Sequence, residues 1–479
     1  MPTKPNIFGS LIWKFLERTG TQGIQFVVQI VLARLLLPED YGIIALVVVF
    51  LSLSEVFVDS GFNTALIQKK DADKTDFSSV FYLSLLLASV LYGVLYFSAP
   101  FIADFYRQPE LIKVIRVLAV VLIFGALNSI QMAYMAKNML FKQLFKSSLG
   151  AMLVSGAVGI ATAYMGWGVW ALVAQQITNK ATLSLTLWFT VKWRPALLFS
   201  WTKLRSLFAF GSKLLASSLL DTGYREIRTL IIGRVYSPAA LCLYKRGILF
   251  PQQIVGNING SIQAVMLPAL SAEQDDKVRV KAMVRRAITT SSFLIAPLMA
   301  LLIASAEPMV RFLLTEKWMG AVIFVQIFSL SYVLMPIHTA NLQAINALGR
   351  SDIFLRLEVI KKVVGITVLI ITVPISIEAM AWGAAVNGVI CSFINAHPNK
   401  KLLNYGYFEQ IKDLLPGFIL ATFMGGGVYL LNYLELSDLL TLILQGFVGV
   451  TIYIVMAKLF KIESLGYFKS KFIELINKR

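Results

Sequence analysis

The residues of this chain that could do chemistry are charged and amide side chains set inside long apolar segments. They recur every three or four residues, so each set shares one face of a helix. The two sets are Lys14, Arg18, Gln22, Gln25 and Gln29 in segment 10–36, and Asp221, Arg225 and Arg228 in segment 207–234. A charge at mid-bilayer costs about 2.5–3.5 kcal/mol, so both stripes are predicted to face a wet or ligand-filled interior.

The two stripes carry more positive than negative charge, which favours an anionic ligand. Arginine binds phosphate and pyrophosphate through paired hydrogen bonds, and lysine binds them as a point charge. The residues predicted to contact such a ligand are Lys14, Arg18, Gln22, Gln25, Arg225, Arg228, Lys245 and Arg246. The carboxylates predicted to exchange a proton or another cation are Glu55, Asp59, Asp221 and Glu226.

The same charged residues have a second interpretation, in which they pair with one another. Asp221 lies one helical turn before Arg225, a spacing at which opposite charges attract. Arg18 has Glu17 beside it and Glu55 on another segment as alternative partners. Under this interpretation the charges stabilise the fold and bind no ligand, and the spacing alone leaves both interpretations open.

Other polar residues in the apolar segments have simpler explanations. Lys14 and Lys213 lie near segment ends, where a long side chain can reach the inner membrane surface. His338 and His397 are isolated histidines, for which we expect packed polar roles, with a proton relay as the alternative.

Sequence motifs for enzymes and bound cofactors are missing from the chain. It contains no G-x-x-x-x-G-K-[ST], H-E-x-x-H, C-x-x-C or G-x-S-x-G pattern. Cys242 and Cys391 provide neither a disulfide framework nor a zinc site. We therefore expect no catalytic residue, no metal and no cofactor, and a carrier or channel in place of an enzyme.

The elements that must position these residues are membrane-spanning helices. The chain has 479 residues, of which 57% are apolar and 15% charged, against about 25% charged in soluble domains. The mean hydropathy is +0.72. Runs long enough to cross a bilayer occur at 10–36, 41–60, 78–101, 114–134, 148–166, 168–190, 207–234, 239–267, 288–306, 320–345, 357–375, 379–397, 414–433 and 438–457. These predict an all-α polytopic membrane protein with about fourteen transmembrane helices.

The distribution of Lys and Arg predicts the orientation of these spans. With a cytoplasmic N-terminus, the inside segments carry 27 basic residues and the outside segments carry 4. This bias places both termini in the cytoplasm. It also explains the net charge of +18 without any nucleic-acid partner.

A weak internal duplication predicts the domain organisation. "FGS" occurs at 8–10 and 210–212, and "ARLLLP" at 33–38 corresponds to "GRVYSP" at 233–238. Span one matches span seven, so the two six-helix lobes are parallel repeats. The predicted parts are an N-lobe at 1–191, an interfacial linker at 192–206, a C-lobe at 207–398, two further helices within 414–457, and an amphipathic cytoplasmic tail at 458–479. The linker and tail mix basic with aromatic or apolar residues, which favours interfacial helices over a plain solvated linker and tail.

Five longer strings resemble the polysaccharide transporter branch of the multidrug/oligosaccharidyl-lipid/polysaccharide (MOP) superfamily. The similarity is to Wzx-type flippases, in particular the colanic-acid and teichuronic-acid exporters. The strings are "ARLLLPEDYG" (33–42), "DSGFNTALIQKKD" (59–71), "VMLPALSAEQDD" (265–276), "EKWMGAVIFVQIFSL" (316–330) and "INALGRSDIFLRLEVIKK" (345–362). The resemblance covers about residues 8–457 and implies a two-lobed MOP-type fold.

The resemblance also implies a function. Its cargo would be an undecaprenyl-pyrophosphate-linked oligosaccharide repeat unit, moved from the inner to the outer leaflet of the bacterial cytoplasmic membrane. Alternating access would be driven by H⁺ or Na⁺, and we expect a monomer that contacts membrane lipids and acts beside polysaccharide polymerase and export proteins. The alternatives are a multidrug exporter of the same superfamily, which a basic interior disfavours, and a membrane polymerase or ligase of lipid-linked glycans, which the short outside loops disfavour.

Overall fold

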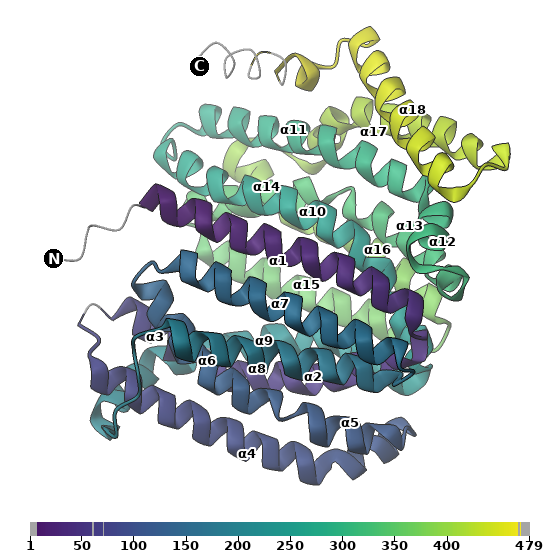
Figure 1. The fold of residues 1–479 in the computed structure, drawn as a ribbon. Coiled ribbons are helices and arrows are strands. Elements are labelled where there is room, and N and C mark those ends of the chain that lie inside the picture. Colours follow the sequence, from purple (N-terminus) through teal and green to yellow (C-terminus); the bar gives the residue numbers. More distant parts are fainter. Residues whose placement is uncertain (1–6, 60–61, 70, 468–469, 471–479) are drawn as a thin grey trace. The chain divides into compact units, whose positions relative to one another are not determined.

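The computed structural model describes residues 7–59, 62–69, 71–467 and 470, and within these ranges all regular structure is helical (Figure 1). The chain divides into two compact units, Met1–Cys242 and Leu243–Arg479. The predicted all-α fold class is therefore confirmed.

The first unit contains nine complete helices among its described residues. They are α1 (Ile7–Leu35), α2 (Pro38–Asp59), α3 (Phe62–Gln68), α4 (Lys74–Tyr106), α5 (Glu110–Leu118), α6 (Val121–Lys137), α7 (Phe141–Tyr164), α8 (Val169–Thr190) and α9 (Trp201–Val235). Helix α7 packs along both α1 and α8, and α2 packs along α9. Figure 1 shows α1 and α7 running side by side.

The second unit begins within helix α10 and contains the remaining helices. They are α10 (Pro238–Ala272), α11 (Lys277–Ala304), α12 (Ala306–Leu314), the 3-10 helix η1 (Glu316–Ala321), α13 (Val322–Tyr332), α14 (Met335–Ala347), α15 (Ser351–Thr372), α16 (Ile377–Leu403), α17 (Tyr407–Tyr429), the 3-10 helix η2 (Leu430–Leu434) and α18 (Asp438–Leu459). Helix α11 packs along α17, and α16 packs against α13, α14 and α15.

Helix boundaries repeat between the two halves of the sequence. Helices α1 and α9 end at Leu35 and Val235, and a proline three residues later begins the next helix in both cases. Proline suits the first helical position because a backbone N–H at that position has no partner within the helix. A residue without an N–H therefore loses no hydrogen bond there. Asp73 and Asp276 likewise cap the N-termini of α4 and α11. These boundaries lie at corresponding places in the two halves, and the duplication itself stays a prediction from the sequence.

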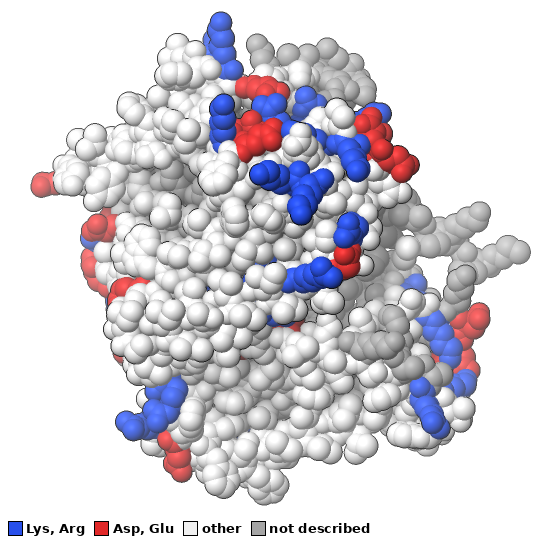
Figure 2. All heavy atoms as spheres, turned by 180° about the vertical axis from the view of Figure 1, so that it is seen from behind, with Lys and Arg blue, Asp and Glu red and all other residues white. Residues whose placement is uncertain are grey.

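Eight stretches of the described chain are long and apolar enough to cross a membrane. They are Pro38–Gln68, Lys74–Tyr106, Phe141–Tyr164, Lys277–Ala304, Glu316–Ala347, Ile377–Leu403, Tyr407–Leu434 and Asp438–Leu459. In Figure 2 most of the visible face is uncharged, and the charged side chains gather in a few groups. The count of fourteen stays a prediction, because helices such as α9 carry several charges along their length.

Two predicted spans are not single helices. The segment expected at 114–134 is broken between α5 and α6 at 119–120, and the segment expected at 320–345 is broken between α13 and α14 at 333–334. These two segments correspond to each other in the predicted duplication. Both breaks thus lie inside predicted spans, and Glu316–Ala347 still qualifies as one stretch long and apolar enough to cross a membrane.

The segment between α8 and α9 differs from its prediction. We expected an interfacial helix over 192–206, but residues 191–200 are not helical, and α9 begins only at Trp201. The backbone N–H groups of Ala196 and Ser200 donate to the hydroxyls of Ser78 and Ser79 on α4, at 3.0 and 2.9 Å. These two backbone N–H groups therefore bond to side chains of α4, where in a helix they would bond to backbone carbonyls of their own segment.

Trp193 fixes the same segment in the core of the first unit. Its indole is 8% exposed and packs against Phe77, Phe81 and Tyr134, with ring centroids 6.0–6.4 Å apart. The pairing of Lys203 with Asp73 adds an anchor outside the apolar region. The hydrogen bond from this ammonium lowers the pKa of Asp73 to about 2. The segment is thus docked on the unit.

The second unit is tied together by a buried network of amide side chains. Asn341 on α14 and Gln410 on α17 exchange hydrogen bonds at 2.7 and 3.0 Å. Asn399 on α16 donates to the Asn341 oxygen at 2.6 Å. His338 lies 3.0 Å from the Asn395 side chain, which agrees with the packed polar role predicted for it. The hydrogen bonds among Asn341, Asn399 and Gln410 join α14, α16 and α17 and fix the relative register of these three helices.

Candidate functional site

A polar cavity of about 460 Å³ lies inside the first unit, between α1, α2, α7 and α8, with Val121 of α6 also lining it. Its polar lining comes from Gln25 and Gln29 of α1, Ser52 and Glu55 of α2, and a group on α8. The α8 group consists of Gln175, Gln176, Asn179 and Lys180. Gln25 and Gln29, Ser52 and Glu55, and the pairs 175/179 and 176/180 of α8 each lie about one turn apart, so the helical repeat brings them to one face.

An ion pair crosses this cavity. The Lys180 ammonium lies 2.9 Å from the Glu55 carboxylate, and the two side chains are 34% and 32% exposed. Nearby, the Asn179 amide donates to the Ser155 hydroxyl at 3.1 Å. Charged groups inside a membrane protein cost free energy unless they are paired or face a wet space. Lys180 and Glu55 are paired with each other, and both face the cavity.

The stripe predicted on α1 is divided in the structure. Gln25 and Gln29 line the cavity, whereas Lys14 and Arg18 are exposed and do not line it. Gln22 is half-buried. The stripe therefore reaches the cavity through its amide residues.

The pairing alternative for Arg18 is not what the structure shows. Glu17 binds Lys14, at 2.7 Å, and Glu55 binds Lys180. Neither carboxylate proposed as a partner of Arg18 is therefore engaged with it. Arg18 stays a predicted ligand contact.

The stripe predicted on α9 contains the ion pair that the second interpretation proposed. Arg225 lies 3.3 Å from Asp221, with side chains 67% and 55% exposed. Glu226 instead accepts a hydrogen bond from the Thr229 hydroxyl at 3.0 Å, and Arg228 is half-buried. Because exposed pairs contribute little to stability, the large exposed area of Arg225 leaves it available to a ligand as well.

The remaining predicted residues lie in three different environments. Arg246 on α10 is buried against Trp318, with its guanidinium carbon 5.2 Å from the ring centroid, a cation–π contact. Lys245 beside it is half-buried. The side chain of Asp59 lies outside the described residues. Ligand contact by Arg246 stays a prediction that its small exposed area does not favour.

Sequence reasoning missed the α8 side of the cavity. Lys180 lies within the apolar segment 168–190, and the two glutamines and the asparagine precede it on the same helical face. A charged residue in that segment was a signal that could have been used. Its partner could not have been found, because Glu55 is 125 residues away.

The fold and its apolar helices define the class of protein as a multi-pass helical membrane protein. Residues 31–323 match the family model described as "Polysaccharide biosynthesis protein". The chain therefore belongs to that family, and the predicted resemblance to the polysaccharide branch of the superfamily is confirmed.

Individual relatives agree with this assignment. The chain is 23% identical to the teichuronic acid biosynthesis protein TuaB of Bacillus subtilis (strain 168), over 78% of each chain. Its fold is similar to a structure of the lipid II flippase MurJ in an inward closed conformation, with a TM-score of 0.73, 16% identity, and coverage of 94% of this chain and 98% of the other.

The same fold also occurs in multidrug transporters. An inward-facing transporter of the multidrug resistance MATE family of the MOP superfamily has a TM-score of 0.59 and 15% identity, covering 85% of this chain and 95% of its own. The MOP-type fold predicted from the sequence is therefore confirmed. The fold alone does not separate a flippase from a multidrug exporter, and the family match is what favours polysaccharide synthesis.

Proposed function

We propose that this protein flips undecaprenyl-pyrophosphate-linked oligosaccharide repeat units from the inner to the outer leaflet of the bacterial cytoplasmic membrane. The observation that carries the proposal is the match to the polysaccharide biosynthesis family over residues 31–323, joined to a fold shared with a lipid II flippase. Multi-pass topology with both termini in the cytoplasm belongs to the same proposal. The protein acts without a catalytic step or cofactor, as a monomer beside polysaccharide polymerase and export proteins.

The physical problem for such a protein is a polar cargo in an apolar solvent. Neither a glycan nor a diphosphate crosses hydrocarbon without partners for its polar groups. The exposed arginines of α1 and α9 supply charge for the diphosphate, while the lipid tail stays in the bilayer. Alternating access then moves the polar part across.

Ion coupling is assigned to the cavity of the first unit. Of the predicted carboxylates whose side chains are described, Glu55 lines this cavity, and its partner there is Lys180 at 2.9 Å. A proton or Na⁺ arriving at Glu55 replaces the ammonium, which then needs another partner. Exchange between the two cations therefore changes the contacts between α2 and α8, which is the kind of switch that coupling needs.

The test is transport of a defined lipid-linked oligosaccharide in proteoliposomes, with and without pH and Na⁺ gradients. Accessibility of the glycan to an impermeant reagent measures flipping. Arg18→Ala and Arg225→Gln are expected to lower the initial rate at least tenfold. Arg225→Lys should retain more activity than Arg225→Gln, because it keeps the charge and loses only the paired geometry.

The matched control is Arg356→Ala, which removes an exposed arginine of α15 outside both stripes and should leave the rate unchanged. Near-normal flipping by Arg18→Ala and Arg225→Gln at equal reconstitution would contradict the cargo assignment. Recovery of Arg225→Gln by an added Asp221→Asn, with Lys no better than Gln, would assign Arg225 to structure.

A further inference from the structure

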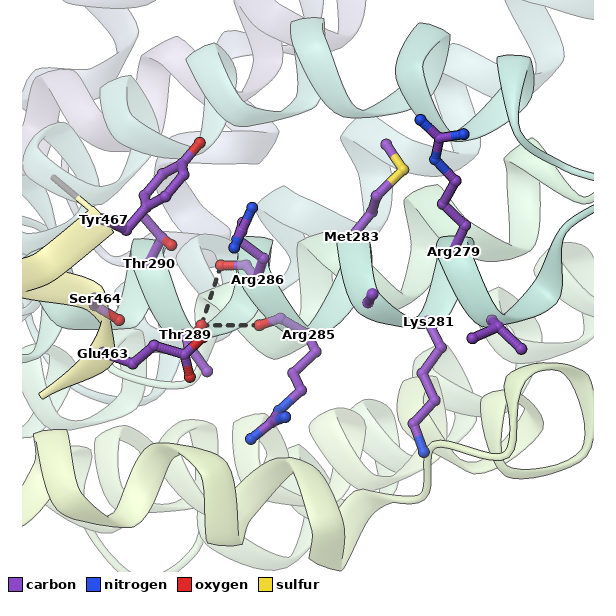
Figure 3. A pocket seen from close by; sticks show the side chains of 12 residues that line it. Arg279, Lys281, Met283, Arg285, Arg286, Thr289, Thr290, Glu463, Ser464 and Tyr467 are labelled. Atoms are coloured by element: carbon purple, nitrogen blue, oxygen red, sulfur yellow. Dashed lines mark hydrogen bonds between the residues drawn. The ribbon is translucent and has the colours of Figure 1, made fainter. Parts of the chain in front are cut away.

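Two adjoining pockets lie within the second unit, along the first half of α11. One has a volume of about 530 Å³ and is lined by basic residues of α11 and by Glu463, Ser464 and Tyr467 of the C-terminal segment (Figure 3). The other has a volume of about 710 Å³ and runs between α10 and α11. Both share Arg286 and Tyr467, so the two pockets meet at these side chains.

The basic residues of α11 point to two sides of the helix. Lys281 and Arg285 face α17, where they bind Glu409 and Asp413 at 2.9 Å. In Figure 3 these two side chains point away from the side that holds Arg279 and Arg286. The charges of Lys281 and Arg285 are therefore neutralised by carboxylates of α17, and these ion pairs hold α11 against α17.

Arg286 lacks such a neutralising partner. Its side chain is exposed, and its guanidinium carbon lies 4.6 Å from the centroid of the Tyr467 ring. No carboxylate of the described residues lies within 4.0 Å of it. Arg279, two turns earlier on the same side, pairs with Glu273 at 3.2 Å but keeps 63% of its side chain exposed. The pocket thus presents one arginine without an ion pair and a second, partly compensated one, and the carboxylate of Glu463 also lines it.

The neighbouring groove is apolar and follows the helical repeat. On α10 its lining includes Ile258, Ile262, Val265 and Ala269, and on α11 it includes Ala287 and Leu294. Val265 is 68% exposed and Leu294 is 40% exposed. The apolar groove adjoins the basic pocket. Together they match a phospholipid, which has a charged headgroup joined to apolar acyl chains.

We propose that these pockets bind one anionic phospholipid, with its phosphate on Arg286 and one acyl chain in the groove between α10 and α11. Arginine forms short paired hydrogen bonds with phosphate, and the Tyr467 ring makes a cation–π contact with the same guanidinium. The Thr290 hydroxyl lines both pockets and lies beside the phosphate position. Membrane phospholipid is taken as the occupant because a basic headgroup position adjoins a groove of acyl-chain character, and the lipid-linked cargo is the alternative that the experiment separates.

The bound lipid would also fix the C-terminal segment. Glu463, Ser464 and Tyr467 close one side of the basic pocket, so a headgroup there is held between α11 and this segment. The predicted topology places the start of α11 at the inner membrane surface, where anionic headgroups are attracted by basic residues. The site is separate from the cavity of the first unit, and its test does not depend on the proposed transport.

The experiment is native mass spectrometry of the delipidated full chain in detergent, titrated with phosphatidylglycerol or phosphatidylcholine. We expect phosphatidylglycerol to bind at least tenfold more tightly than phosphatidylcholine. Arg286→Ala should weaken phosphatidylglycerol at least tenfold, and Arg286→Lys by less. Ala269→Trp, which fills the groove, should also weaken it, and Arg356→Ala should change nothing.

Three results would overturn the proposal. They are equal binding of the two phospholipids, unchanged binding by Arg286→Ala, and displacement of phosphatidylglycerol by an equal amount of lipid-linked oligosaccharide pyrophosphate, which would assign the site to cargo. Thermal midpoints without lipid verify that each variant is folded. If Arg286→Ala is unstable, the unmodified protein still decides, because dioctanoyl phosphatidylglycerol and inorganic phosphate should bind more weakly than the long-chain lipid.

Discussion

At the scale of single residues, the Glu55–Lys180 pair is the feature with the sharpest consequences. Removing one partner leaves a charge without compensation, so Glu55→Gln and Lys180→Gln should each lower the free energy of unfolding. With both side chains one-third exposed, we expect a loss of about 1–3 kcal/mol, between the ranges for exposed and buried pairs. The double variant should recover most of this loss, because no unpaired charge remains.

Thermal midpoints of the purified variants measure this effect, and proteoliposomes separate it from coupling. The double variant should be stable yet insensitive to pH and Na⁺ gradients if Glu55 carries the ion. The control is the exposed Arg350–Asp352 pair, whose double glutamine and asparagine variant should keep both properties. Gradient-driven transport by the stable double variant would remove Glu55 from the coupling mechanism.

This pair also shows what could be predicted from the sequence at the residue scale. The Asp221–Arg225 pair was predicted as an alternative because its partners are one helical turn apart. The partner of Glu55 could not be predicted, since helical spacing orders residues on one helix and says nothing about which helix packs against it. The same limit explains why Arg246 was assigned to a ligand, although Trp318 covers it.

At the scale of elements, residues 191–200 behave as part of the core of the first unit. Trp193→Ala should lower the free energy of unfolding by about 3–5 kcal/mol, the usual cost of removing a buried large aromatic side chain. Trp193→Phe should cost less, because part of the packing against Phe77 and Phe81 remains. The measurement is the thermal midpoint of the purified protein.

The matched control for this segment is Trp201→Ala, because Trp201 begins α9 and is 68% exposed. Its loss should leave the midpoint nearly unchanged. Similar midpoints for Trp193→Ala and Trp201→Ala would mean that the segment lies at the interface, as the sequence predicted. The prediction failed because alternating basic and aromatic residues suit both an interfacial helix and a docked strand-like segment. The hydroxyls of Ser78 and Ser79 select the second, and they lie more than 110 residues earlier.

At the scale of the whole molecule, the family and the all-α fold could be predicted because hydrophobic length and longer motifs are local properties of the sequence. The breaks at 119–120 and 333–334 could not, since both lie in apolar runs that favour a continuous helix. The number of crossings is a separate matter. Helices α9 and α10 are absent from the stretches that qualify by length and composition, yet the predicted topology needs both of them to cross.

Impermeant thiol labelling of intact cells decides whether they do. The native Cys242 and Cys391 are both buried and can be replaced by Ser and Ala to give a silent background. Ser237, between α9 and α10, and Asp275, between α10 and α11, are both exposed. The ratio of 27 basic residues inside to 4 outside requires Ser237→Cys to be labelled from outside. Asp275→Cys should be labelled only after permeabilisation, as should a cysteine added after Arg479.

Protection of Ser237→Cys in intact cells, with labelling after permeabilisation, would remove α9 and α10 from the membrane-crossing set. It would also remove the basis for treating α1 and α9 as equivalent helices of two parallel lobes.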